Sequence, residues 1–283
     1  MVHKIAQPED ILVKVQEFYP KQYHKVSESG FMDELYRRSA IMSGVREYAQ
    51  SAEEVHILDV AAGRGRQGYF INKVVGKENS KKVVMHEIDI SKVELRKEGI
   101  IGDMGHLPFA NKSMDIVFMN NLPSLLSAVS SHVIRTKHDG ATKERMLEML
   151  EVATDAMYKL NLLEGVRVLK DGGVIMLGGK YIGQGIESIE KNIEDLPLKV
   201  DKFEVLELER QVVPLWRNYG IDIEKPTFML ISLKKTGSGI EKLVELQQQL
   251  LHTSLEQLMR IEGMEESASM LEEVLEEMRK ASK

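Results

Sequence analysis

The sequence predicts an α/β fold in which helices cover both faces of a mostly parallel sheet. Between about residues 55 and 235, short runs rich in β-branched residues alternate with stretches of helical periodicity, which is typical of parallel strands joined by helices. The last two runs follow one another without a full-length helical stretch between them, which favours an antiparallel pair at the sheet edge. With 283 residues, the chain is long enough to bury a large core.

Helices are expected on either side of this central region. Residues 1–50 carry apolar residues at spacings of three and four, interrupted by Pro20 and by the Ser-Glu-Ser-Gly stretch before Phe31, which predicts an N-terminal helical cap. The central domain is then expected over residues 51–236, and a C-terminal helical extension over residues 237–283.

Six short apolar runs in the central domain are the strand candidates. Two adjacent glycines, Gly172 and Gly173, precede the apolar residues of the fourth run and predict a tight reversal with a structural role. In chain order, the six runs are VHILDV, KVVMHEIDI, MDIVFM, GVIMLGG, FEVLELE and TFMLISL.

The C-terminal extension is acidic and amphipathic. Residues 239–283 contain ten Glu and five Lys or Arg, so they supply −5 of the net charge of −6. Apolar residues recur there at helical spacing, beginning with Val244 and Leu251. The sequence leaves two interpretations open: the helices pack on their own domain, or they form the interface of a homodimer or a complex with a protein partner.

Composition excludes several classes of protein. Cysteine is absent, which excludes disulfides, thiolate metal sites and a cysteine nucleophile. Neither the extension nor the rest of the chain has a basic balance, so a nucleic-acid partner is disfavoured. The sequence has no apolar run of membrane-spanning length and does not begin like a signal peptide. We therefore expect a cytoplasmic protein with no membrane association.

A glycine-rich segment follows the first strand candidate. Gly63, Gly65 and Gly68 have the spacing G-x-G-x-x-G, which is common in dinucleotide sites. In a dinucleotide site the strand leads straight into the first glycine, whereas here Asp59 lies four residues before Gly63. A carboxylate at this point repels a pyrophosphate and suits a ligand with a sulfonium and an ammonium group, such as S-adenosylmethionine.

The segment ILDVAAGRG resembles the first motif of class I S-adenosylmethionine-dependent methyltransferases. Asp59, Ala61, Gly63 and Gly65 are in register with this motif, and Ala61 stands where the family often has glycine. Alanine at this position costs little unless the backbone there needs a positive φ. The resemblance implies a Rossmann-like three-layer sandwich with a seven-stranded sheet. It also implies S-adenosyl-L-methionine as the cofactor and S-adenosyl-L-homocysteine as the product.

Two later segments resemble further cofactor-binding motifs of this family. In EIDIS, the resemblance assigns Asp89 to the ribose hydroxyls, with Ile90 beside it and Glu87 as the alternative carboxylate. In GDMGHLPF, it assigns Asp103 to the adenine amino group and the backbone of Met104 to the adenine ring.

The segment after MDIVFM is expected to face the methyl acceptor. The resemblance places Asn120 in contact with cofactor and acceptor. The following Asn-Leu-Pro-Ser resembles the Asn-Leu-Pro-aromatic motif of adenine and amine methyltransferases, but Ser124 cannot stack on a base. His132 and His138 are the nearest candidates for a general base, because a neutral imidazole accepts a proton near pH 7. No metal site is expected.

The sequence thus predicts a methyltransferase that transfers a methyl group directly, by in-line displacement, to a small molecule or metabolite. One alternative is a methyltransferase acting on RNA adenine or on another amine or macromolecule. A second is a nicotinamide oxidoreductase that uses the same glycines. A third is a non-catalytic protein that binds S-adenosylmethionine.

Overall fold

The computed structural model describes the central domain, the second half of the N-terminal cap and the start of the C-terminal extension. The described residues are 30–89, 99–102, 105–120, 140, 144, 147, 158–179, 189–190, 193–207, 227–237, 243, 245–247, 249–250 and 253.

The described part of the predicted cap is helical. It contains α3 (Gly30–Met42) and α4 (Val45–Ser51), and Gly44 turns the chain between them with a φ of 71°. Within the central domain, α5 (Arg66–Val75) follows the glycine-rich loop, and a 3-10 turn, η1 (Ser80–Lys82), leads into the second strand. Residues 158–168 are also helical.

Seven strands form one sheet in the order β3-β2-β1-β4-β5-β7-β6. The strands from β3 to β5 are parallel, and β7 is antiparallel to both β5 and β6. The strands are β1 (Val55–Val60), β2 (Val83–Asp89), β3 (Ile100–Ile101), β4 (Met114–Asn120), β5 (Leu169–Gly179), β6 (Leu198–Glu207) and β7 (Thr227–Lys235).

The predicted mostly parallel sheet with an antiparallel pair at its edge is confirmed. Within that pair, β7 is the reversed strand and lies between β5 and the edge strand β6. The sequence runs locate six strands, whereas β3 has two residues and is too short to produce a periodic pattern. Strand β6 begins at Leu198, five residues before the predicted run.

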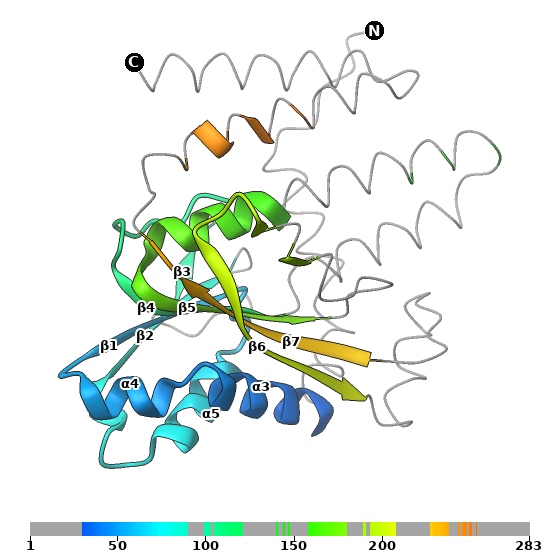
Figure 1. The fold of residues 1–283 in the computed structure, drawn as a ribbon. Coiled ribbons are helices and arrows are strands. Elements are labelled where there is room, and N and C mark those ends of the chain that lie inside the picture. The colour runs from blue at the N-terminus through cyan, green and yellow to red at the C-terminus, as the bar shows by residue number, and fades with distance from the viewer. Residues whose placement is uncertain are drawn as a thin grey trace, which may run out of the picture.

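The sheet separates two hydrophobic cores, and the molecule is a three-layer sandwich (Figure 1). Helices α3, α4 and α5 lie below the sheet in Figure 1, and helical residues 158–168 lie above it. Strand β1 contributes to both cores because its side chains alternate between the two faces. Val55 and Ile57 face α3–α5, whereas Leu58 and Val60 belong to the opposite core.

The first described residues of the C-terminal extension pack on the central domain. Leu243 is buried in the core above the sheet, and Leu246 and Leu250 pack against the same core. Their spacing places all three on one face of a helix. Most of the extension, including Val244 and Leu251, lies outside the described residues. None of the helices in the described part of the chain is long and apolar enough to cross a membrane.

The tight reversal predicted at Gly172 and Gly173 is wrong, because both glycines lie inside β5. Their role there is nonetheless structural. Gly172 has a φ of 78°, which favours glycine. A Cβ at Gly173 would lie 2.8 Å from the carbonyl oxygen of Asp115. The pairing of β4 with β5 shifts register at this point, which leaves extra, unpaired residues in β5. The two glycines lie in this β-bulge.

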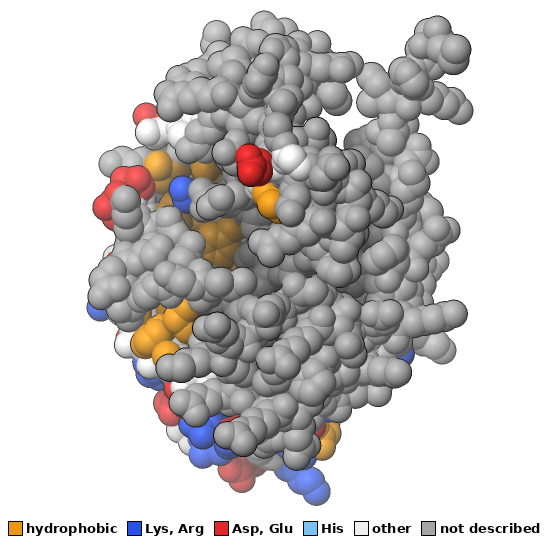
Figure 2. Space-filling view, turned by 90° about the vertical axis from the view of Figure 1, so that its right-hand side faces the viewer, with side chains coloured by type: hydrophobic (Ala, Val, Ile, Leu, Met, Phe, Trp, Pro, Cys, Tyr) orange, Lys and Arg blue, Asp and Glu red, His pale blue; other side chains and the backbone are white. Residues whose placement is uncertain are grey.

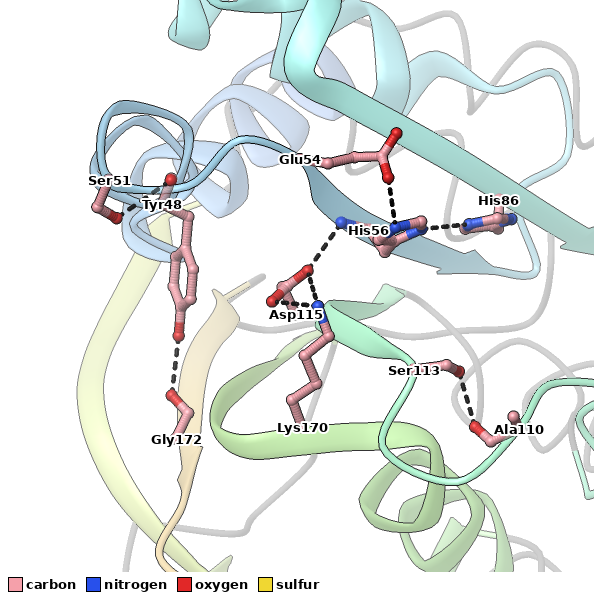
Figure 3. Close-up of polar contacts among 10 residues, drawn as sticks. All are labelled: Tyr48, Ser51, Glu54, His56, His86, Ala110, Ser113, Asp115, Lys170 and Gly172. Atoms are coloured by element: carbon pink, nitrogen blue, oxygen red, sulfur yellow. Dashed lines mark hydrogen bonds and ion pairs between the residues drawn. The ribbon is translucent and has the colours of Figure 1, made fainter.

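A polar cluster joins the amino ends of β1 and β4 to the middle of β2 (Figure 3). His56 Nδ1 lies 3.2 Å from His86 Nε2, and Glu54 lies 3.0 Å from the other ring nitrogen of His56. The two ring planes are nearly parallel, at 12°. At 3.2 Å between ring nitrogens, one imidazole donates to the other, so the pair needs a neutral ring. Burial, and then the neighbouring His56, lower the pKa of His86.

This histidine pair predicts destabilisation by acid. Because the pKa of His86 is lower in the folded chain than its usual value of 6.5, protonation below that pH favours the unfolded chain. The free energy of unfolding is therefore fully present above pH 6.5 and falls as the pH drops below it. Between pH 7.5 and 5.5, we expect the melting temperature to fall less in His86→Gln than in the wild type. His106→Gln, at an exposed loop histidine, is the control and should retain the wild-type slope.

Candidate cofactor site

The candidate site lies at the carboxyl ends of β1, β2 and β4. The strand order reverses between β1 and β4, since β2 and β3 lie on one side of β1 while β4 and β5 lie on the other. In open α/β sheets, ligands bind outside the carboxyl ends of the strands at such a reversal. The cofactor-binding residues predicted from the sequence are therefore expected at the carboxyl ends of the strands beside this reversal.

The loop between β1 and α5 turns through left-handed backbone conformations. Ala61, Gly63 and Gly65 have φ values of 57°, 51° and 67°, and Gly65 is the N-cap of α5. Gly68 lies in the first turn of α5 against β2, where a Cβ would be in ordinary contact with the Glu87 carboxylate at 3.5 Å. Alanine is therefore costly at position 61, because a positive φ strains a residue that has a Cβ.

Three backbone amides of this loop donate to the protein itself. The amide of Ala62 donates to the carbonyl of Ile88 at 3.1 Å, and the amide of Gly65 donates to the carbonyl of Ala62 at 2.9 Å. The amide of Gly63 donates to Oδ2 of Asp89 at 2.9 Å. Loops that cradle a pyrophosphate direct such amides at the ligand, whereas these three are already satisfied.

Carboxylates from β1 and β2 gather beside the loop. Asp59 is only 4% exposed and lies opposite Glu87 in the parallel register, so both side chains point to the α3–α5 face. Asp89 ends β2 and reaches the loop, whereas Glu87 lies two residues earlier, beneath Gly68. This placement favours Asp89 over Glu87 for a ligand held by the loop.

Asn120 ends β4 and is buried beneath the N-terminal helix α3. Its amide nitrogen donates to Oε1 of Gln67 in α5 at 3.0 Å and to Oγ of Ser39 in α3 at 3.2 Å. All three side chains are buried. The sequence did not indicate Ser39, which stands in no motif, or Gln67, which occupies a variable position of the glycine-rich segment.

The segment that follows the predicted adenine-binding residues is fixed to the helix above the sheet. The amide of Leu107 donates to Glu164 at 3.0 Å, and Arg167 donates to the carbonyls of Leu107 and Phe109 at 2.7 and 2.8 Å. Arg167 also pairs with Glu164 at 2.8 Å. No sequence signal pointed to this anchor, because it joins residues more than 50 positions apart.

The structure brings together six of the predicted cofactor residues around the loop and the neighbouring strand ends. They are Asp59, Ala61, Gly63, Gly65, Asp89 and Asn120. The other predicted site residues, Ile90, Asp103, Met104, His132 and His138, lie outside the described residues. Tyr36 of α3 stacks on Phe70 of α5 with ring centroids 6.4 Å apart. Within the described part of the chain, no group of three or more His, Cys, Asp or Glu could hold a metal ion.

Comparisons with known proteins find similarity only among solved structures. No protein-family model matches the chain, and no curated protein matches it. The YcgJ protein from Bacillus subtilis is 13% identical over 71% of this chain and 99% of its own, with a TM-score of 0.44. An S-adenosylmethionine-dependent methyltransferase from Methanosarcina mazei is 14% identical over 68% and 97%, with a TM-score of 0.39. A loganic acid methyltransferase with S-adenosylhomocysteine is 11% identical over 75% and 97%, with a TM-score of 0.47.

The sheet itself identifies the fold class. A seven-stranded sheet in the order β3-β2-β1-β4-β5-β7-β6, with β7 antiparallel to its neighbours, is the sheet of class I S-adenosylmethionine-dependent methyltransferases. The resemblance noted in the sequence is therefore confirmed at the level of the fold.

The left-handed backbone at Ala61 predicts a stabilising substitution. Ala61→Gly should raise the free energy of unfolding by about 0.5–1 kcal/mol, because the strain of a Cβ at positive φ exceeds the entropy that glycine adds to the unfolded chain. Urea denaturation measures this change. Ala62 is the matched control: its φ is not positive, so Ala62→Gly should lower the free energy of unfolding by about 0.5–1 kcal/mol. A loss of stability in Ala61→Gly would contradict the assigned backbone strain.

Proposed function

We propose that this protein is a methyltransferase that binds S-adenosyl-L-methionine at the carboxyl ends of β1 and β2. It transfers the methyl group to a small-molecule acceptor and releases S-adenosyl-L-homocysteine. The observation that carries the proposal is the hydrogen bond from the Gly63 amide to Asp89, which joins the glycine-rich loop to a carboxylate at the end of the neighbouring strand.

The loop favours a cationic ligand over a diphosphate. The amides of Ala62, Gly63 and Gly65 donate within the protein, and carboxylates from two adjacent strands gather beside them. A pyrophosphate needs free amide donors and is repelled by carboxylates. The sulfonium and ammonium groups of S-adenosylmethionine are attracted by the same carboxylates. This arrangement disfavours the alternative of a nicotinamide oxidoreductase.

The roles of the cofactor residues follow from the family resemblance and from their positions. Asp89 would accept hydrogen bonds from the two ribose hydroxyls, since a carboxylate has two oxygens and several acceptor sites. Asp59 would supply negative charge beneath the loop. Ile90, Asp103 and Met104 keep the ribose and adenine roles that the resemblance assigns.

Methyl transfer requires little chemistry from the protein. The positive sulfur already activates the methyl carbon, so holding the acceptor in line with the carbon–sulfur bond supplies much of the rate, about 7–11 kcal/mol in well-oriented reactions. A general base is needed only where the acceptor must lose a proton. His132 and His138 remain the candidates for that role.

A small molecule is the favoured acceptor because neither the charge of the sequence nor the described surface favours a nucleic-acid substrate. Its net charge is −6, and Ser124 replaces the stacking aromatic residue of adenine methyltransferases. On the face shown in Figure 2, the described basic and acidic side chains are mixed toward the bottom, where α3, α4 and α5 lie in Figure 1. Nucleic-acid binding favours a basic patch, whereas mixed charges do not attract phosphates strongly.

Calorimetric titrations with S-adenosylhomocysteine and with NAD test the proposal. We expect binding of S-adenosylhomocysteine and no binding of NAD. The reverse result would reject the methyltransferase assignment in favour of an oxidoreductase. Incubation with S-adenosylmethionine and separate pools of metabolites or RNA then identifies the acceptor class through the release of S-adenosylhomocysteine. Binding without turnover on any pool would favour a non-catalytic protein.

The ribose assignment predicts that Asp89→Ala weakens S-adenosylhomocysteine binding at least tenfold. The variant loses the acceptor of the ribose hydroxyls and also the acceptor of the Gly63 amide. Glu87→Gln is the matched control and should retain affinity within about twofold, because Glu87 lies deeper along β2. A tenfold loss in Glu87→Gln with unchanged affinity in Asp89→Ala would transfer the ribose role to Glu87.

A further inference from the structure

We infer that the N-terminal helix α3 positions the cofactor loop, and that Ser39 is a positioning residue acting through Asn120 and Gln67. This inference rests on the proposed function and extends the site to a helix that no motif marks. Its basis is that α3 contacts the first turn of α5 and the end of β4 through buried polar groups.

The first two residues of α5 are both held by α3. Arg66 forms an ion pair with Asp33, and Nε2 of Gln67 donates to the carbonyl of Tyr36 at 3.2 Å. These residues follow directly after Gly65, the last left-handed residue of the loop. Any shift of α3 therefore moves the point at which the loop enters the helix.

The side chain of Asn120 connects this contact to the sheet. Its amide group has two hydrogens, which are used by Oε1 of Gln67 and by Oγ of Ser39. Its Oδ1 lies over Gly178 of β5, where a Cβ would come within 2.3 Å of it. Four elements, α3, α5, β4 and β5, thus meet at one amide whose orientation is fixed.

This geometry distinguishes a positioning role from direct donation to the cofactor. With both hydrogens used inside the protein, Asn120 donates nothing to a ligand. Ser39 is fully buried, so removing its hydroxyl leaves a hydrogen of Asn120 without a partner. Buried unsatisfied donors are costly, so Asn120 and Gln67 rearrange and the loop is held less firmly.

The test measures the dissociation constant of S-adenosylhomocysteine by calorimetry and the free energy of unfolding by urea denaturation. We expect Ser39→Ala to raise the dissociation constant about tenfold. Ser43→Ala is the matched control, because Ser43 is also buried but bonds to nearby backbone in the turn between α3 and α4: it donates to the carbonyl of Ala40 and accepts from the amide of Val45. Both variants should lose stability, whereas only Ser39→Ala should lose affinity.

Asn120→Asp tests whether Asn120 positions Gln67 or contacts the cofactor directly. A carboxylate has no hydrogen to donate, so Gln67 must turn its own amide and release the carbonyl of Tyr36. We therefore expect weaker binding by at least tenfold. Tighter binding would mean that Asn120 faces the cationic cofactor directly. In the double variant Ser39→Ala, Asn120→Asp, the rise in the dissociation constant should be smaller than the product of the rises in the two single variants. The effects are not independent, because both changes disrupt one hydrogen-bond network.

The outcomes keep the two proposals apart. A wild-type protein that does not bind S-adenosylhomocysteine rejects the proposed function. Wild-type affinity in Ser39→Ala rejects the positioning role while leaving the function intact. If Ser39→Ala does not fold, Asp33→Asn replaces it, since Asp33 is 41% exposed and its loss frees Arg66 without opening the core. We expect about a threefold rise in the dissociation constant, and an unchanged constant would overturn the inference.

Discussion

The hydrogen bond between the Gly63 amide and the Asp89 carboxylate is the constraint on which the candidate site depends. The loop after β1 passes through three left-handed residues and has few side chains of its own to hold it. A carboxylate at the end of the adjacent parallel strand therefore fixes the loop from outside. The same bond uses a donor that a diphosphate would need, so one interaction both shapes the loop and supports the proposed preference for a cationic ligand.

The rest of the fold brings these two strand ends together. Strand β1 is buried on both faces, between α3–α5 on one side and helical residues 158–168 on the other. Parallel neighbours with both faces covered are held in register by packing, because a shift by one residue would exchange the two cores. The register of β1 with β2 in turn sets Asp59 opposite Glu87 and leaves Asp89 level with the loop.

The two ends of the sheet differ in how their charges are used. At the amino ends, Asp115 accepts from Lys170 at 2.8 Å and from the His56 amide at 2.8 Å, which ties β1, β4 and β5 together (Figure 3). At the carboxyl ends, carboxylates come from adjacent strands and face the glycine-rich loop. The first arrangement stabilises the sheet, whereas the second concentrates negative charge beside a turn, where ligands of this fold class bind.

The sequence by itself determined the strands with long apolar runs, the helices in the described part of the cap and the glycine-rich loop with its flanking acids. These features depend on local burial and backbone freedom, which residue type and spacing report directly. Tertiary structure alone decided the two-residue strand β3, the insertion of β7 beside β5 and the positive φ of Ala61. It also decided the contact of Ser39 with Asn120, 81 positions away, and the anchoring of the Leu107 segment by Arg167. Such contacts leave no periodic signal, because a polar side chain acquires its partner only when the helices and the sheet have packed.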